Sequence, residues 1–164
     1  AFRQHMERVL SFAEVARSDG AKLLTGGKRA AAQPRGWFIE PTAVLAADND
    51  ARVCREEIFG PFATFLEFDT LDEAITIANA SNFGLVNYVW SQDLNAAMRC
   101  SRDIRAGTVW INTPMMRELR APFGGYKESG IGRDGPQASL EFFTELKATI
   151  IPIDGVRMHR FGAS

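Results

Sequence analysis

The chain has 164 residues, of which 46% are hydrophobic and 24% charged, and its formal net charge is −1. This composition is typical of a soluble globular domain and excludes a disordered segment. The balanced charge offers no basic surface for nucleic acid or an anionic membrane, so small molecules and protein partners are the expected ligands. The sequence has no apolar run of membrane-spanning length and no signal peptide at its start, which favours a cytoplasmic protein.

Residues 2–17 form the first predicted element, an amphipathic helix. Its apolar residues recur at spacings of three and four, as on the buried face of a helix. They are Phe2, Met6, Val9, Leu10, Ala13 and Ala16. The sequence starts inside this pattern and without a methionine, so we expect it to be a piece of a longer protein. A short strand follows within residues 18–27, and a second strand is predicted at 37–45, where Pro41 favours an edge position or an irregular course.

Strands and helices alternate from residue 61 onward. The predicted strands are 62–68, 85–91 and 107–112, and the predicted helices are 70–80 and 93–104. Thr70 and Glu73 have the spacing of a capping box at the start of the first of these helices. This order predicts the α/β class, with a largely parallel sheet and flanking helices. Active sites in such sheets lie beyond the carboxyl ends of the strands.

A long loop follows the last of these strands and precedes a predicted helix at 136–143 and a strand at 145–153. Loops of this length in compact domains are usually functional or disordered. Gly130 and Gly132 form a G-x-G pattern, but they do not follow a strand directly and open a long helix, as a phosphate-binding loop requires. We expect these glycines to let the backbone turn tightly past other segments instead.

The cysteines and histidines form no cluster in the sequence, so neither a disulfide framework nor a metal site is expected. Arg52 and Arg55 flank Cys54 closely enough to favour a thiolate, whereas Cys100 lies inside a predicted helix. Burial as a small apolar residue is the alternative for both cysteines. The histidines, His5 and His159, lie near the two ends, where a surface role is expected.

Two pairs of charged residues are candidates for ligand binding. Neighbours on a strand point to opposite faces, so Glu56 and Glu57 are not expected to form an acid–base pair. One of these carboxylates can accept hydrogen bonds from two vicinal hydroxyls; the alternative is that both are solvated. Arg117 and Arg120 in the long loop are either solvated or form a clamp for a carboxylate, which a guanidinium binds with two hydrogen bonds.

Several motifs together resemble the C-terminal part of the aldehyde dehydrogenase superfamily. These are GWFIEPT at 36–42, EEIFGP at 56–61, GTVWIN at 107–112, APFGGYKESGIGRDG at 121–135 and FFTELKATI at 142–150. The resemblance covers residues 2–153 and implies an NAD- or NADP-dependent enzyme that oxidises an aldehyde to a carboxylic acid.

The resemblance also implies roles for particular residues. Glu57 would bind the nicotinamide-ribose hydroxyls of the cofactor, and Phe59 would pack near its nicotinamide ring. Segment 112–123 would line the substrate entrance, with Phe123 near the aldehyde. The stretch MMRELRAPFGG at 115–125 resembles the muconic semialdehyde dehydrogenases, whose substrates carry a carboxylate.

Betaine-aldehyde and broad-range members of the superfamily remain alternatives for the substrate. A cationic substrate, however, fits the two arginines of segment 115–125 poorly.

The family's nucleophilic cysteine and general-base glutamate would precede the matched segment. We therefore expect no catalytic residue in this chain, and no activity from the chain alone. The resemblance implies part of a catalytic domain at residues 1–144, an oligomerisation strand at 145–155 that pairs with a second subunit through residues 147–153, and a tail at 156–164. The alternative is a stand-alone, non-catalytic module for ligand binding or assembly.

Overall fold

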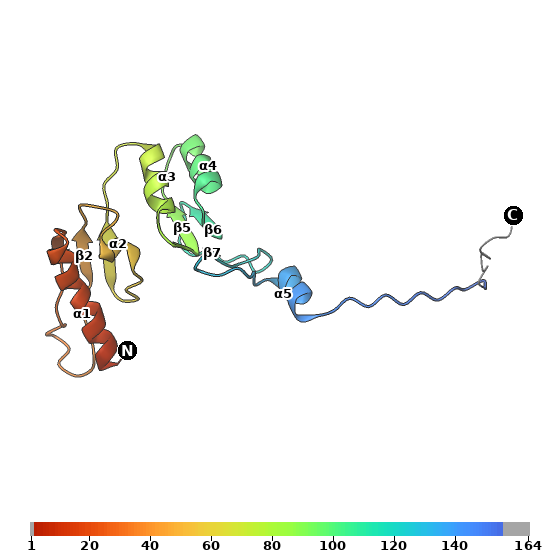
Figure 1. The fold of residues 1–164 in the computed structure, drawn as a ribbon, viewed down its shortest axis with the longest axis horizontal. Helices are drawn as coiled ribbons and strands as arrows, with labels where there is room; N and C mark the ends of the chain where they lie inside the picture. Colours follow the sequence, from red (N-terminus) through yellow and green to blue (C-terminus); the bar gives the residue numbers. More distant parts are fainter. Residues whose placement is uncertain (1, 156–164) are drawn as a thin grey trace.

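The computed structural model describes residues 2–155, and it runs from an N-terminal sheet through a helical middle part to an extended C-terminal arm (Figure 1). The predicted tail at 156–164 and His159 lie outside the described residues. The elements in chain order are α1 (Arg3–Ser18), β1 (Lys22–Thr25), β2 (Thr42–Leu45), α2 (Arg52–Arg55), β3 (Phe62–Phe65), α3 (Leu71–Asn79), β4 (Phe83–Gly84), β5 (Val86–Val89), α4 (Leu94–Asp103), β6 (Thr108–Ile111), β7 (Tyr126–Lys127) and α5 (Pro136–Phe143).

Helix α1 packs on the first sheet and forms the main core with it. The sheet has the order β1–β2–β3, with β1 antiparallel and β3 parallel to β2. Val9 and Phe12 of α1 are buried against Val44 of the central strand. Of the two alternatives predicted for the strand around Pro41, the edge position is wrong. The irregular course is present, because β2 begins only at Thr42 and Ile39 forms an isolated bridge with Arg29. The proline stands one residue before β2, where its missing N–H removes no hydrogen bond from the ladder.

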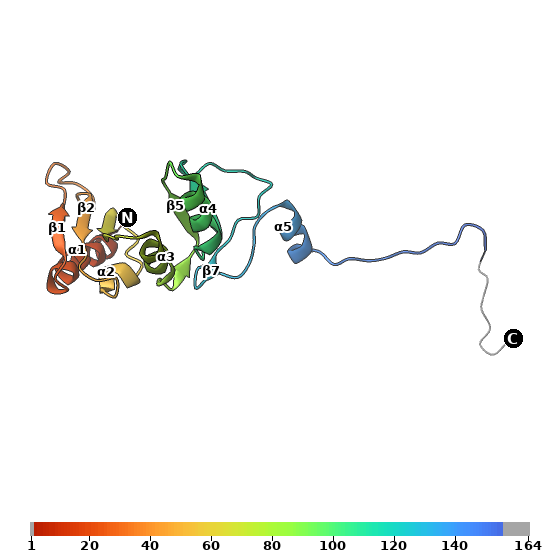
Figure 2. The same cartoon turned by 90° about the horizontal axis from the view of Figure 1, so that it is seen from above.

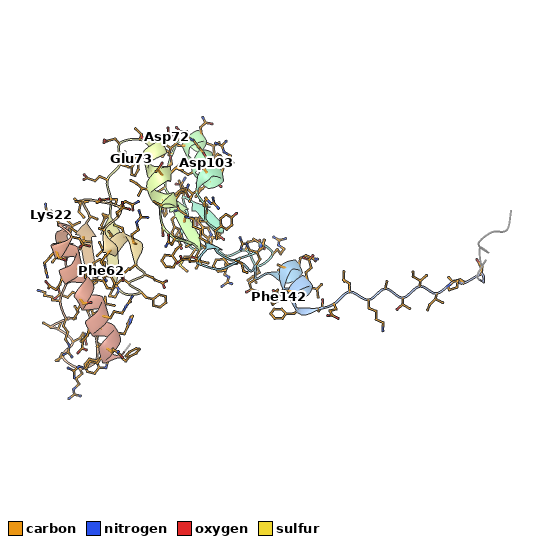
Figure 3. All side chains as sticks on the ribbon, in the orientation of Figure 1. Lys22, Phe62, Asp72, Glu73, Asp103 and Phe142 are labelled. Atoms are coloured by element: carbon orange, nitrogen blue, oxygen red, sulfur yellow. The ribbon has the colours of Figure 1, made fainter. Side chains whose placement is uncertain are left out.

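Helices α3 and α4 lie side by side next to the parallel pair β5–β6, as Figures 1 and 2 show. The hydroxyl of Thr70 accepts the N–H of Glu73 at 3.2 Å, and the Glu73 carboxylate accepts the N–H of Asp69 at 2.8 Å, so a capping box is present with its second bond one residue early. Arg99 of α4 forms ion pairs with Asp72 of α3 and with Asp103 of its own helix. Figure 3 labels the two acidic residues, Asp72 on α3 and Asp103 on α4.

The α/β class is confirmed, but the predicted single parallel sheet does not form within the described residues. The parallel pairs β2–β3 and β5–β6 belong to separate sheets, and β4–β7 is an antiparallel pair of its own. Residue periodicity identifies strands and crossover helices but does not specify which strand edges pair. No helix in the described part of the chain has both the length and the apolar character needed to cross a membrane.

The loop after β6 returns to the middle part and is fastened there by Lys127. The residue has a φ of 55°. Its Nζ donates to the carbonyl oxygens of Asn79 and Ser81 at 2.8 and 2.7 Å. Its ammonium group therefore lies at the C-terminal end of α3, where the helix dipole favours a positive charge.

Substituting Lys127 by methionine should destabilise the fold by about 2 kcal/mol, because two half-buried carbonyl groups lose their donor. Urea-induced unfolding measures this change. Lys147→Met, which removes the ammonium group of an exposed arm residue, is the control and should change the unfolding free energy by less than about 0.5 kcal/mol. Equal effects of the two substitutions would contradict the role given to Lys127.

Residues 144–155 run away from the body of the chain as an extended arm after α5 (Figure 1). The strand predicted at 145–153 is absent here, because no other described segment of this chain supplies the hydrogen bonds of a ladder. The arm exposes Leu146, Ile150, Ile151 and Ile153. Its pairing with a second subunit remains a prediction.

Candidate functional site

A cavity of about 470 Å³ lies between β6 and the long loop. Its walls come from the first three residues of β6, from the loop and from the first half of α5 with the two residues before it. Arg117 and Phe123 both line it, and the Arg117 guanidinium lies 5.7 Å from the centre of the Phe123 ring. Two of the predicted substrate-binding residues are therefore brought together.

The second predicted arginine is placed differently. Arg120 does not line the cavity, and its side chain is 86% exposed. It donates two hydrogen bonds to the Glu118 carboxylate, each of 2.8 Å. Arg120 lowers the pKa of Glu118 to about 2, so this pair stays ionised at neutral pH. Of these two arginines, Arg117 has no ion pair with another described residue, whereas Arg120 is paired with Glu118. A carboxylate clamp formed by both arginines stays a prediction.

Phe123 is held at the base of a hairpin that contains the glycine-rich segment. Its backbone N–H and C=O exchange hydrogen bonds of 2.7 Å with those of Asp134. Arg133 donates from Nη1 to the carbonyl oxygens of Gly125 and Gly132, both at 2.8 Å. A Cβ atom at Gly124 would lie 2.2 Å from the Gly132 carbonyl oxygen, so the backbone of this hairpin is closely packed at Gly124. At Gly130 and Gly132, for which tight packing against other segments was predicted, a Cβ atom would meet nothing within 4 Å.

Sequence reasoning missed Trp110 as a component of the cavity. This β6 residue lines the cavity and donates from its indole nitrogen to the Met116 carbonyl oxygen at 2.8 Å. The available signal was a tryptophan near the carboxyl end of a predicted strand, directly before the long loop.

The predicted cofactor-binding residues lie in the segment between α2 and β3. Glu56 and Glu57 follow the short helix α2 rather than standing on a strand as predicted. Arg52 binds the Glu56 carboxylate at 2.6 Å and lowers its pKa. The Glu57 carboxylate is exposed and has no hydrogen-bond donor among the described residues. It is the one of the two that is available to a ligand.

Helix α1 holds this segment through three consecutive backbone carbonyl groups. Arg8 donates to the carbonyl oxygens of Glu57 and Ile58 at 2.8 and 2.9 Å, and His5 Nε2 donates to that of Phe59 at 2.9 Å. Phe59 has a φ of 56°, in the left-handed region, and its side chain is 76% exposed. A backbone conformation that is costly for a bulky residue is thus maintained at a predicted ligand-contact residue.

The two groups of predicted site residues line different cavities. Phe59 lines a hollow together with α1 and the segment around Trp37, whereas Arg117 and Phe123 line the cavity at β6. The N-terminal sheet and helix α5 lie on opposite sides of the helical middle part (Figure 1). The predicted cofactor-binding and substrate-binding residues therefore lie at two separate places in the described part of the chain.

The cysteines have the surroundings of structural residues. Burial raises the pKa of the Cys54 thiol and outweighs the opposing effect of Arg55. The thiol donates to the Asp48 carbonyl oxygen at 3.5 Å, and Cys100 is buried in α4. A protonated thiol is a poor nucleophile. Among residues 2–155, no three His, Cys, Asp or Glu side chains are grouped so that they could hold a metal ion.

Comparison with known proteins identifies the family of this chain. The family model described as "Aldehyde dehydrogenase family" matches residues 2–149. The chain belongs to the aldehyde dehydrogenase family. It is 42% identical to the 2-aminomuconic 6-semialdehyde dehydrogenase of Pseudomonas sp. over 154 residues, and 40% identical over 154 residues to the 2-aminomuconic semialdehyde dehydrogenase of Mus musculus.

A solved aldehyde dehydrogenase structure has the same fold. The indole-3-acetaldehyde dehydrogenase of P. syringae in complex with NAD+ matches with a TM-score of 0.83 and 43% identity, over 89% of this chain and 30% of that one. The two curated relatives are matched over 92% and 91% of this chain but only 31% and 32% of their own length. The chain thus spans about a third of the aldehyde dehydrogenases that it resembles.

Proposed function

We propose that this chain forms the C-terminal part of an NAD(P)-dependent aldehyde dehydrogenase that oxidises a carboxylated semialdehyde to the corresponding acid. In this proposal residues 1–144 complete the catalytic domain, and residues 145–155 pair with a second subunit in a homo-oligomer. The nucleophilic cysteine and the general base belong to the rest of the enzyme. One observation supports this proposal most directly. The cavity at β6 is lined by Arg117, whose guanidinium has no carboxylate partner among the described residues and lies next to the Phe123 ring.

Glu57 and Phe59 supply the cofactor half-site. A carboxylate with two free oxygens can accept hydrogen bonds from both hydroxyls of a ribose. An exposed phenyl ring, held by its left-handed backbone and by His5, can pack against the flat face of a nicotinamide. The cofactor, when bound, supplies the acceptor for the hydride that leaves the substrate. The residues present therefore fit NAD or NADP.

Arg117 supplies the substrate preference. Its guanidinium forms no ion pair within the described residues, so it is available to bind the carboxylate of a substrate. Phe123 lies against the guanidinium and limits its freedom. The muconic semialdehyde dehydrogenases among the relatives agree with this preference by their names. Arg120 contributes less than Arg117 to binding of the substrate carboxylate, because Glu118 already neutralises its charge.

Substitution of Glu57 by glutamine in the complete enzyme tests the cofactor role. The amide keeps the size of the side chain but has one acceptor oxygen instead of two. We expect weaker positioning of the cofactor, a higher KM for NAD+ and slower hydride transfer, each by about tenfold for the loss of one charge-assisted hydrogen bond. Steady-state kinetics with a deuterated aldehyde measures the hydride step.

Glu56→Gln is the matched control for this experiment. It changes the neighbouring carboxylate, which is paired with Arg52, and should leave the kinetics within twofold of the unsubstituted enzyme. If Glu57→Gln also left both parameters unchanged, the ribose-binding role of Glu57 would be refuted.

A further inference from the structure

Trp110 makes a contact that joins the sheet to the substrate loop. Its Nε1 donates to the Met116 carbonyl oxygen at 2.8 Å, one residue before Arg117. Within the described residues this is the hydrogen bond that ties segment 113–120 to another element. The remaining hydrogen bonds of that segment join Glu118 to Arg120 and to Ala121 inside the loop.

The indole ring itself is fixed by the neighbouring strand. Trp110 lies opposite Tyr88 in the parallel register of β5 and β6. The two rings stack with centroids 5.1 Å apart and an angle of 14° between their planes. A stacked ring on a strand has little freedom, so the direction of its N–H is set by the sheet. The sheet thereby determines where the Met116 carbonyl lies.

The backbone of the substrate loop turns sharply at two residues close to this hydrogen bond. Asn112 and Met115 both have left-handed backbone angles, with φ of 53° and 48°. Asn112 is held in place, since its side chain exchanges hydrogen bonds of 2.9 and 2.7 Å with the backbone of Ser91. Met115 has no such support from its own side chain, which is exposed. Trp110 donates its hydrogen bond to the residue directly after this turn, Met116.

We infer that Trp110 is a positioning residue that determines the preference for carboxylated aldehydes by holding the backbone next to Arg117. This inference rests on the proposed function, because it requires Arg117 to bind the substrate carboxylate. Trp110 sets the position of the guanidinium relative to Phe123 and to the cavity wall. It acts on substrate binding and not on the chemical steps.

The test is Trp110→Phe in the complete enzyme, assayed with adipic semialdehyde and with hexanal, which differ by the terminal carboxylate. Phenylalanine can still stack on Tyr88 but has no N–H. Trp110 lines the cavity, so KM for hexanal serves as the reference for any change in cavity shape. We expect KM for adipic semialdehyde to rise about fivefold relative to KM for hexanal, the size of one net hydrogen bond, while kcat for the two aldehydes changes by the same factor. Trp90→Phe is the matched control, because Trp90 is an exposed tryptophan on the neighbouring strand end, and it should change neither KM.

Combination with Arg117→Ala separates the inference from the proposed function. If Trp110 acts through Arg117, then Trp110→Phe has no further effect on KM once Arg117 is alanine. A selective rise in KM for Arg117→Ala but none for Trp110→Phe would overturn the inference and leave the proposed function standing. The absence of a selective effect for Arg117→Ala would overturn both.

A purely structural role of Trp110 gives a different result. It would raise KM for both aldehydes equally, and that outcome also overturns the inference. If the phenylalanine variant fails to fold, 3-benzothienylalanine placed at position 110 keeps the size and the stacking of the side chain but lacks the N–H. The same fivefold selective rise is then expected, and an unchanged KM for adipic semialdehyde would overturn the inference.

Discussion

Replacing Arg117 by alanine should raise KM for a carboxylated aldehyde by about 10- to 100-fold, while KM for an uncharged aldehyde of the same length changes by less than about twofold. The range follows from the 1.5–3 kcal/mol that a hydrogen bond to a charged group contributes. The guanidinium lines the cavity beside Phe123 and has no carboxylate partner among the described residues. Steady-state kinetics of the complete enzyme with adipic semialdehyde and hexanal measures the difference.

Arg120→Ala is the comparison that makes this result specific. Arg120 is a charged residue of the same loop, but it is exposed and bound to Glu118. Loss of Arg120 alone would leave the Glu118 carboxylate of the cavity wall unpaired next to Arg117, so Arg120→Ala is combined with Glu118→Ala. The pair has no net charge, and we expect its loss to alter KM for the carboxylated aldehyde by less than about threefold, the small effect typical of exposed ion pairs. A larger effect from this double substitution than from Arg117→Ala would contradict the placement of the substrate carboxylate.

Replacing Gly107 by alanine should destabilise the protein by at least about 3 kcal/mol, at the upper end of the cost of overpacking. A Cβ atom at Gly107 would lie 1.6 Å from the carbonyl oxygen of Gly124 and 2.7 Å from its carbonyl carbon. Both are backbone atoms of the hairpin that carries Phe123, so no side-chain rotation relieves the clash. Gly107, directly before β6, would be forced away from the hairpin. Urea-induced unfolding and the yield of folded protein measure the effect.

Gly132→Ala is the matched control in the same loop. A Cβ atom at Gly132 meets nothing within 4 Å, and its backbone lies outside the left-handed region. We expect the unfolding free energy to change by less than about 0.5 kcal/mol. Similar destabilisation by both substitutions would show that the contact between Gly107 and Gly124 has no special weight.

The local elements of the fold were predictable because each depends on residues close in sequence. Apolar spacing located α1, and the capping box at Thr70 marked the first residue of α3. The pairing of strands was not predictable in the same way, because hydrogen bonds between strands join segments far apart in sequence. For the same reason the sequence did not show that the strand after Pro41 is central. A proline alone does not tell whether it precedes a strand or stands inside one.

Residue types were predictable for the candidate site, but their pairing was not. The arginine-rich loop was recognisable, yet only the three-dimensional contacts separate Arg117, beside Phe123, from Arg120, neutralised by Glu118. The bond from Trp110 to Met116 depends on the turn at Met115. A left-handed backbone at a methionine has no signal in the sequence, because this conformation is rare for that residue type.

The most direct test of the central claim is NADH formation from adipic semialdehyde and NAD+, measured side by side for the complete enzyme and for the purified 164-residue chain. The account predicts that the complete enzyme forms NADH, that it still does so after Cys54→Ser and Cys100→Ser, and that the chain alone forms none. NADH formation by the chain alone, lost on substitution of Cys54, would contradict it.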